Sequence, residues 1–291
     1  METKQMPPLA YKHIHSLLDD YDVFLFDIWG VIVEGTQTYP GVVEHINYII
    51  KHNKQVFFVS NAPVRRSALL PMFQSWHLAV NEEQIITAGS VAAHMIVNSA
   101  NLWGVRYPFI YHLLGDINYL MDAEQIMLTT NIHKADLLLL TLYCDQTADL
   151  DLNQWDPVLE TASIRKIPIL CACPDIGIMQ QGVYRYCAGY FAEKVKQWGG
   201  AVRYAGKPYP AIYQRVLDQL PGIPKKRILM IGDTLSTDIL GANQIGIDSA
   251  LVLTGNATIM HNQFHSLEDK LIQLTKATQS ITPHCIIQLG D

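Results

Sequence analysis

The sequence predicts an α/β protein built around a parallel sheet, and three observations support this fold class. Uninterrupted apolar runs occur at residues 23–26, 56–59 and 228–231, and such runs are typical of strands buried on both faces. Each run stops at polar residues. Between the first two runs, residues 42–50 repeat apolar side chains with helical spacing,. A strand–helix–strand unit of this kind makes its two strands parallel neighbours.

The first part of the chain continues this alternation of helices and strands. Gly30 follows the first apolar run closely and lets the chain leave the strand sharply,. Pro40-Gly41 ends the loop that comes next. In chain order we expect a helix at 9–19, a strand at 23–26, a loop at 31–39, a helix at 42–50, a strand at 56–59, a helix at 63–76 and a strand at 85–87,.

The middle of the chain has the pattern of a second, smaller α/β unit. Its strand-like segments are 109–114, 135–143 and 167–173, and segments 115–121 and 154–162 are helix-like,.

The last part returns to the first pattern. Pro208 is expected in the first turn of a helix, where proline is tolerated, and Pro221-Gly222 ends that helix,. Further on we expect a strand at 228–231, a helix at 234–245, a strand at 250–253, a helix at 268–277 and a strand at 285–287.

Composition excludes several classes of partner. The chain has 291 residues, a formal net charge of −6 and no basic run, which argues against nucleic acid and anionic membranes as partners. No apolar stretch approaches the roughly 20 residues that span a bilayer. The first residues lack the layout of a signal peptide,.

Five cysteines, an odd number, are present. Cys171 and Cys173 are expected on one face of a strand, and a metal pair there has no supporting Cys-x-x-Cys motif or histidine cluster,. We therefore interpret them as buried reduced thiols and the compartment as cytoplasmic. The others are Cys144, Cys187 and Cys285.

Polar residues of a particular kind follow the predicted strands. Asp27 ends the first, where open α/β sheets keep their ligand sites,. Each residue alone has an ordinary alternative, such as a turn aspartate or a solvated lysine. Together they supply a nucleophilic carboxylate, a hydroxyl, a cation and an acidic pair, which suits phosphoryl transfer assisted by magnesium. The set is Asp27, Ser60-Asn61, Lys207, and Asp233 with Asp238.

With these motifs in this order, the sequence resembles the haloacid dehalogenase (HAD) superfamily of hydrolases over almost its whole length. It is most similar to the class IIA branch, which includes N-acetylglucosamine-phosphate, p-nitrophenyl phosphate, pyridoxal phosphate and phosphoglycolate phosphatases. The stretches that match this branch are Pro40-Gly41, Ser60-Asn61, Pro174-Asp175, Gly241-Ala242-Asn243, Gly246-Ile247-Asp248 and Leu253-Thr254-Gly255.

The resemblance implies a Rossmann-like core interrupted by an α/β cap domain of the C2 type. We expect the core at residues 1–89 and 205–291 and the cap at 90–204. Cap domains of this branch often pair, so the resemblance is compatible with a homodimer.

The resemblance also implies roles for the site residues. Asp27 attacks phosphorus, Ser60 and neighbouring amides hold the phosphoryl oxygens, and Lys207 neutralises charge. Mg²⁺ is held by Asp27, Asp233, Asp238 and the main-chain carbonyl of Trp29. The cap segment 175–182 faces a small phosphorylated metabolite, and the substrate-binding candidates are Ser60, Asn61, Asp175, Met179 and Gln180.

Trp29 departs from the family pattern. Phosphatases of this superfamily usually have a second Asp at this place, which protonates the leaving oxygen and later activates water. Tryptophan offers only an N–H donor. Four interpretations stay open: a phosphatase that is slow or favours good leaving groups, a dehalogenase-like hydrolase, a protein that binds a phosphorylated ligand without catalysis, or a phosphatase whose acid comes from elsewhere, such as Glu34 or a cap residue.

Overall fold

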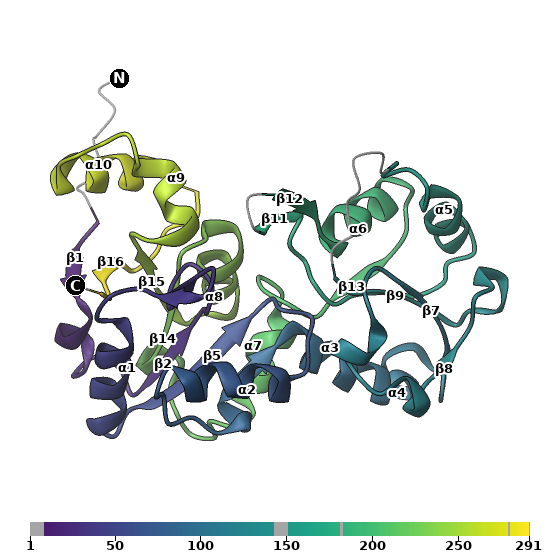
Figure 1. The fold of residues 1–291 in the computed structure, drawn as a ribbon, viewed down its shortest axis with the longest axis horizontal. Helices are drawn as coiled ribbons and strands as arrows, with labels where there is room; N and C mark the ends of the chain where they lie inside the picture. Colours follow the sequence, from purple (N-terminus) through teal and green to yellow (C-terminus); the bar gives the residue numbers. More distant parts are fainter. Residues whose placement is uncertain (1–8, 143–150, 181–182, 279, 291) are drawn as a thin grey trace. The chain divides into compact units, whose positions relative to one another are not determined.

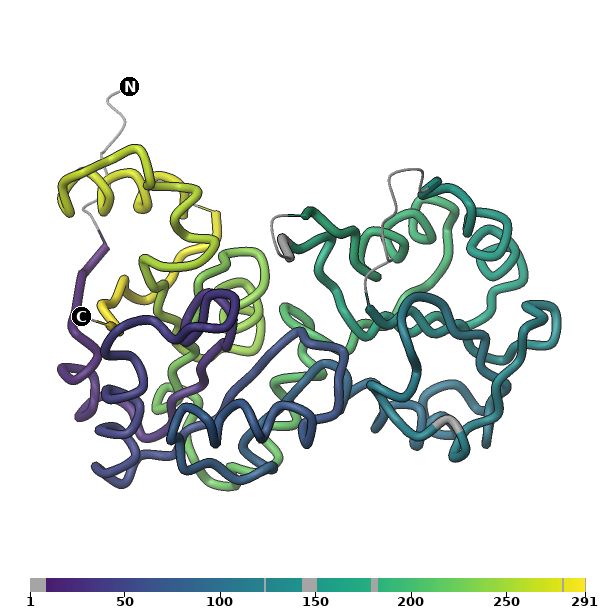
Figure 2. Tube along the Cα trace, viewed as in Figure 1, coloured from purple at the N-terminus to yellow at the C-terminus, as the bar shows by residue number. Residues whose placement is uncertain are grey.

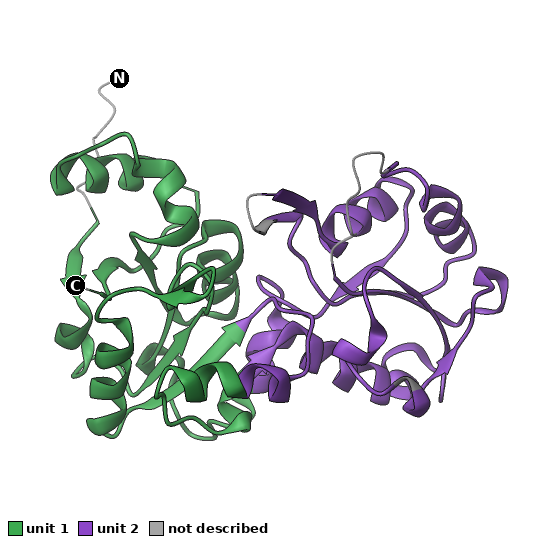
Figure 3. Cartoon of the chain, in the orientation of Figure 1, with its two compact units in different colours: residues 1–59, 71–85, 216–291 green, residues 60–70, 86–215 purple. Residues whose placement is uncertain are grey.

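The computed structural model describes residues 9–142, 151–180, 183–278 and 280–290. Cys144 and the end of the predicted substrate-facing segment, Gln181-Gly182, lie outside the described residues. The chain divides into two compact units (Figure 3). We call residues 1–59, 71–85 and 216–291 the first unit, and residues 60–70 and 86–215 the second unit. The predicted core and cap boundaries stay a prediction.

The first unit is built on a seven-stranded sheet of the described residues, in the order β1-β16-β15-β14-β2-β5-β6 (Figure 1). Strands β2, β5, β14, β15, β16 and β1 pair in parallel along this order. The strands are β1 (Tyr11–His13), β2 (Val23–Phe26), β5 (Gln55–Ser60), β6 (Ile85–Thr87), β14 (Ile228–Gly232), β15 (Asp248–Val252) and β16 (Cys285–Gln288), with a separate hairpin of β3 (Val33–Glu34) and β4 (Gln37–Thr38).

Helices surround this sheet. In α1 (Val42–Lys51), Val42, Ile46 and Ile49 are buried on one side, as the apolar spacing predicts,. The others assigned wholly or partly to this unit are η1 (Ile14–Leu17), α2 (Arg66–Ser75), η2 (Glu82–Gln84), η6 (Lys225–Arg227), η7 (Leu235–Ile239), α8 (Leu240–Ile245), η8 (Gly255–Ala257), α9 (Thr258–His261) and α10 (Leu267–Ala277).

The second unit has its own parallel sheet of five described strands, in the order β13-β10-β9-β7-β8. Its strands are β7 (Phe109–Leu113), β8 (Met127–Leu128), β9 (Leu137–Leu140), β10 (Ile169–Cys171) and β13 (Val202–Tyr204), with a hairpin of β11 (Gly177–Gln180) and β12 (Val183–Tyr186). Its helices are α3 (Ala88–Val97), α4 (Ser99–Trp103), η3 (Ile117–Tyr119), η4 (Ala123–Gln125), η5 (Ile132–Lys134), α5 (Asp156–Ile164), α6 (Ala188–Gln197) and most of α7 (Pro210–Leu217).

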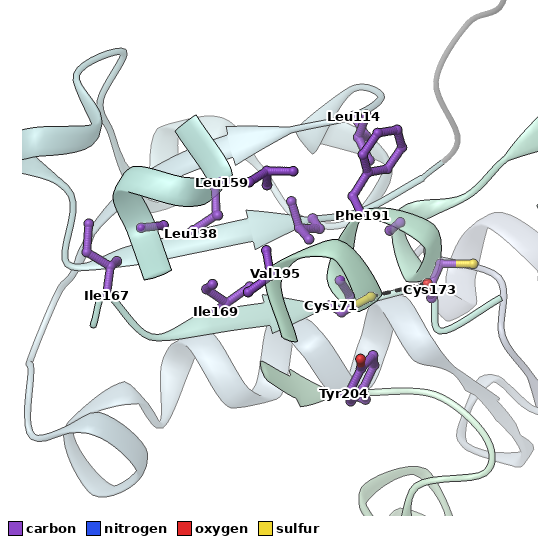
Figure 4. Packing of buried hydrophobic residues seen from close by; sticks show 14 of the residues in the cluster. Leu114, Leu138, Leu159, Ile167, Ile169, Cys171, Cys173, Phe191, Val195 and Tyr204 are labelled. Atoms are coloured by element: carbon purple, nitrogen blue, oxygen red, sulfur yellow. Dashed lines mark hydrogen bonds between the residues drawn. The ribbon is translucent and has the colours of Figure 1, made fainter. Parts of the chain in front are cut away.

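The core of the second unit lies between its sheet and two helices. Leu138 and Ile169 from neighbouring strands pack with Leu159 of α5 and with Phe191 and Val195 of α6 (Figure 4). Removing these apolar side chains from water is the main favourable contribution to the folding of this unit.

Three sequence predictions about local structure were wrong. Residues 9–19 form β1 and the short 3-10 helix η1 instead of an amphipathic helix, because Tyr11–His13 pair with β16 from the other end of the chain (Figure 2). Residues 115–121 contain only the 3-10 helix η3. Pro208 precedes its helix, which begins at Pro210, and the Lys207–Pro208 peptide is cis.

The predicted α/β fold class is confirmed. The buried strands at 23–26, 56–59 and 228–231 are present, and β2 and β5 are parallel neighbours, as expected from the intervening helix. None of the described helices is long and apolar enough to cross a membrane.

Candidate functional site

The strand order of the first unit creates a point where the direction of chain progression reverses. From β2 the chain adds β5 and then β6 on one side, and later adds β14 and β15 on the other. Open α/β sheets bind ligands outside the carboxyl ends of their strands at such a reversal. Asp27 follows β2 and Asp233 follows β14, and the Asp27 backbone N–H donates to the Ile231 carbonyl oxygen at 2.9 Å. Pairing of these strands therefore brings the two carboxylates together.

Three carboxylates meet at this edge of the sheet. One oxygen each of Asp27, Asp233 and Asp238 lies within 4.8 Å of the other two. Asp233 is 2% exposed and Asp238 is fully buried. Burying like charges at this separation is unfavourable unless positive charge offsets them. An all-oxygen set of this kind fits a hard divalent cation such as Mg²⁺.

Asp233 is fixed from several directions. Its Oδ1 accepts from the Thr234 hydroxyl at 2.9 Å, and its Oδ2 accepts from the Asn256 backbone N–H at 2.6 Å. A Cβ atom on either Gly30 (φ +85°) or Gly255 (φ +57°) would lie 2.2 Å from Asp233 Oδ2. The carboxylate thus occupies space that any other residue at those two positions would fill.

Asp238 lies in η7, a π-helical turn that follows β14 after Asp233 and Thr234. Turns of this type are rare and occur frequently at functional sites. The Asp238 Oδ2 accepts from the Thr234 backbone N–H at 3.1 Å, and a Cβ on Gly232 would lie 2.2 Å from the Asp238 side chain. The Gly232-Asp233-Thr234 sequence is therefore what lets both acidic side chains approach the same place.

Trp29 is 40% exposed, whereas Asp233 and Asp238 are buried. The chain around it is held by the Thr254 hydroxyl, which donates to the Gly30 carbonyl oxygen at 2.7 Å. The Tyr39 hydroxyl is an ionisable group in the segment that follows Trp29. Burial and the charge of Glu34, with a smaller contribution from Asp233, raise its pKa above the ordinary tyrosine value,.

A second group of predicted residues meets within the second unit. The Asn61 Nδ2 donates to Asp175 Oδ1 at 2.8 Å and to the Lys207 carbonyl oxygen at 3.1 Å. The Asn61 Oδ1 accepts from the Lys207 backbone N–H at 2.7 Å. A Cβ on Gly206 would lie 2.4 Å from Asn61 Oδ1. Asn61 therefore holds the backbone of Lys207 through two hydrogen bonds. Lys207 itself is buried, with 1% of its surface exposed.

The remaining predicted residues lie on strands. Ser60 ends β5, is buried, and accepts from the Ala62 backbone N–H at 3.1 Å. Met179 and Gln180 lie on β11 opposite Tyr184 and Val183. The structure thus gathers Asp27, Asp233 and Asp238 in the first unit and Asn61, Asp175 and Lys207 in the second. The functional roles assigned to all of them stay predictions.

We call Asp27, Asp233 and Asp238 the acidic group. Sequence reasoning missed the residues that form hydrogen bonds with it. Thr234 and Asn256 donate to Asp233, and the sequence motif that contains Thr234 predicts no role for either residue. Thr234 directly follows Asp233, so a local signal was available. Asn256 lies 23 positions further on and donates through its backbone, so its residue type carried no signal.

Two family models match the chain. The model described as "Haloacid dehalogenase-like hydrolase" matches residues 24–105, and the one described as "HAD-hydrolase-like" matches residues 204–271. The first includes Asp27, and the second includes Lys207, Asp233 and Asp238.

Relatives and solved structures of similar length also match. An acid sugar phosphatase of Staphylococcus aureus is 22% identical over 246 residues, which cover 83% of this chain and 90% of that protein. The crystal structure of a possible sugar phosphatase of the HAD superfamily from Cytophaga hutchinsonii is 26% identical, with a TM-score of 0.72 and coverage of 96% and 98%. The 4-nitrophenylphosphatase of Thermotoga maritima is 21% identical, with a TM-score of 0.70 and coverage of 94% and 97%, and shares the fold.

Proposed function

Because the chain belongs to the haloacid dehalogenase-like hydrolases, we propose that it is a magnesium-dependent phosphatase of a small phosphorylated metabolite that acts through an aspartyl-phosphate at Asp27. The observation that carries this proposal is the convergence of Asp27, Asp233 and Asp238 where the strand order reverses. The matched relatives named as phosphatases support the reaction class.

The Asp27 carboxylate is the proposed nucleophile. Its oxygen forms a bond to phosphorus while the bond from phosphorus to the leaving oxygen breaks, and water later hydrolyses the aspartyl-phosphate. Asp233 and Asp238 would hold Mg²⁺ together with Asp27, and the bound ion would offset the negative charge of the carboxylates and the phosphoryl group. The family resemblance assigns Ser60 and Lys207 to the phosphoryl oxygens.

Trp29 decides which substrates such an enzyme cleaves well. With no carboxylic acid at this position, the leaving oxygen departs without protonation from residue 29. General acid–base catalysis is typically worth about 10²–10⁴-fold. We therefore propose that the enzyme favours substrates whose leaving oxygens are stable as anions.

Trp29 also favours a second candidate function, the binding of a phosphorylated ligand without turnover. In that case Asp27, Asp233 and Asp238 would hold an ion whose charge offsets that of the phosphoryl group, and Asp27 would serve as a metal ligand alone. The two candidates share the binding site and differ in whether phosphate is released.

A screen of phosphorylated metabolites with Mg²⁺, reading released phosphate, separates the two. The phosphatase proposal expects release by the wild type and none by Asp27→Asn. Calorimetric titration with Mg²⁺ tests the metal site in parallel, with loss of binding expected for Asp233→Asn and not for the exposed control Asp20→Asn. Metal and ligand binding without phosphate release from any substrate would support the binding function instead.

A further inference from the structure

A cluster of three histidines lies apart from the acidic group, in the first unit. One ring nitrogen each of His13, His15 and His45 lies within 4.8 Å of the other two. The proposed phosphatase reaction uses none of them. Imidazole nitrogen is a preferred ligand of zinc and its neighbours among the transition metals, whereas Mg²⁺ prefers oxygen.

The fold brings these histidines together from three elements. His13 ends β1 and caps η1, and His15 lies within η1. His45 lies in the first part of α1, which packs beside η1. Apolar side chains of η1 and α1 are fully buried, namely Ile14, Leu17 and Ile46. Their packing fixes the positions of the two helices that carry His15 and His45.

The geometry of the rings is close to that of a metal site. The His15 Nε2 and His45 Nδ1 atoms are 3.0 Å apart. Two nitrogens bound to one tetrahedral zinc at about 2.0–2.1 Å are about 3.3 Å apart. The three ring centroids are 4.7–5.1 Å apart and each pair of rings is nearly perpendicular. A shift of a few tenths of an ångström therefore brings the first two nitrogens to the spacing of ligands.

Neighbouring groups orient the rings. The His15 ring stacks on Tyr48 of α1 at a centroid distance of 4.0 Å. The His13 Nδ1 accepts from the His15 backbone N–H at 3.2 Å. A metal needs a ring nitrogen with a free lone pair, so His13 gives up this bond on binding: either Nδ1 itself binds the ion, or Nε2 binds it and Nδ1 carries the proton.

We propose that His13, His15 and His45 form a binding site for a zinc-type transition-metal ion, with water completing the coordination. On binding, the proton shared by His15 and His45 moves to the other nitrogen of the ring that carried it, and both facing nitrogens bind the ion. The bound ion joins β1 and η1 to α1, so it stabilises the edge of the sheet where β1 pairs with β16. This site is independent of the proposed phosphatase function.

The test is titration of the full chain with Zn²⁺ in saturating Mg²⁺, which keeps the acidic group occupied. We expect one Zn²⁺ per chain and a rise in the melting temperature, since an ion that binds the folded state alone stabilises it. Binding should weaken at least tenfold in His45→Gln and in His15→Gln. It should be unchanged in His265→Gln, a control at an exposed histidine outside the cluster, and in Asp233→Asn.

Cobalt provides a second readout. Co²⁺ bound by three imidazoles in a tetrahedral site gives visible absorption bands that an all-oxygen octahedral site does not give strongly, so the bands should appear in the wild type and be lost in His13→Gln. Circular dichroism and the metal-free melting temperature verify that each variant is folded. Zn²⁺ affinity that is the same in the three cluster variants and the wild type, or that falls only in Asp233→Asn, would overturn the proposal.

Discussion

At the scale of single residues, the absence of a side chain on Gly30 and on Gly255 makes room for the Asp233 carboxylate. Gly30 and Gly255 both adopt positive φ, and a Cβ on either would lie 2.2 Å from Asp233 Oδ2. Real Cβ atoms are not found at such distances from another atom, so the carboxylate would have to move. Because a metal site tolerates little displacement of its ligands, these glycines would support the proposed Mg²⁺ site by fixing the position of Asp233.

Gly30→Ala should therefore weaken Mg²⁺ binding at least tenfold and reduce any phosphatase activity by a similar factor. Gly35→Ala is the matched control, since Gly35 also has positive φ (+61°) but no atom within 4 Å of the new Cβ. Both substitutions carry a backbone cost of about 1 kcal/mol. Calorimetry with Mg²⁺ compares them, and equal affinities in the two variants would show that Asp233 is not confined in this way.

Asn61 acts on the backbone of Lys207. Its side chain makes hydrogen bonds with both the N–H and the carbonyl of Lys207, and with Asp175. Asn61→Ala leaves those buried backbone groups without these bonds, at about 1–3 kcal/mol for each unsatisfied group. Denaturant unfolding should show a loss of about 2 kcal/mol or more, whereas the exposed Asn101→Ala should change stability by less than about 0.5 kcal/mol. If Asn61→Ala lowered the free energy of unfolding no more than Asn101→Ala does, the hydrogen bonds of Asn61 would not stabilise the fold as proposed.

At the scale of elements, Asp22 joins the amino ends of three neighbouring strands. It precedes β2, Arg227 precedes β14 and Lys54 precedes β5. Arg227 donates to Asp22 through Nε at 2.8 Å and through a terminal nitrogen at 2.6 Å, and the Lys54 ammonium lies 3.3 Å from Oδ1. These bonds, from Arg227 above all, lower the pKa of Asp22 to about 2.

The sign of the pH effect follows from this lowered pKa. A carboxyl with a lower pKa in the folded state than in the unfolded state stabilises the fold above its unfolded value, about 3.9, and loses that contribution as the pH falls toward about 2,. Because the Asp22 side chain is 41% exposed, solvent screening limits the contribution to about 1 kcal/mol. Asp22→Asn should have a lower melting temperature than the wild type at pH 7. This difference in melting temperature should become smaller as the pH falls from 4 to 2. A difference that stays constant over this range would contradict the assignment.

Elements with strong local signals could be predicted from the sequence. The run Val23–Phe26 and the apolar spacing of 42–50 identified β2 and α1, because burial alone determined both patterns. The first segment was predicted wrongly as a helix. Leu9, Ile14, Leu17 and Leu18 fit a helical spacing, yet the pairing of Tyr11–His13 with β16, more than 270 positions away, decides the structure there,.

The candidate site was predictable to the same extent. Asp27 and Asp233 could be chosen because each directly follows a strand, and parallel pairing of β2 with β14 brings these ends together. Asp238 lies in the turn η7 after β14 and was chosen from its spacing to Asp233. The contacts of Asn61 with Lys207, 146 positions apart, depend on tertiary packing that no local pattern reports. The same is true of the histidine cluster, which joins His13 and His15 to His45 across 30 positions.

At the scale of the whole molecule, membership of the hydrolase family favours phosphatase activity, whereas Trp29 favours slow cleavage of substrates with poor leaving groups. Solved HAD structures match the chain over more than nine-tenths of its length, and the acidic group of the first unit suits phosphoryl transfer. Trp29 lacks the acid that assists departure of the leaving oxygen. In the proposed mechanism, Asp27 attacks phosphorus, and the rate depends on the stability of the departing anion.

A leaving-group series on the wild type, Trp29→Asp and Asp27→Asn, with released phosphate as the readout, distinguishes this mechanism from its alternatives. We predict that the wild type cleaves aryl and acyl phosphates much faster than alkyl phosphates. This dependence on leaving-group pKa should flatten in Trp29→Asp and activity should disappear in Asp27→Asn. A wild-type rate that is independent of leaving-group pKa, or phosphate release no greater than that of Asp27→Asn for every substrate, would contradict the mechanism.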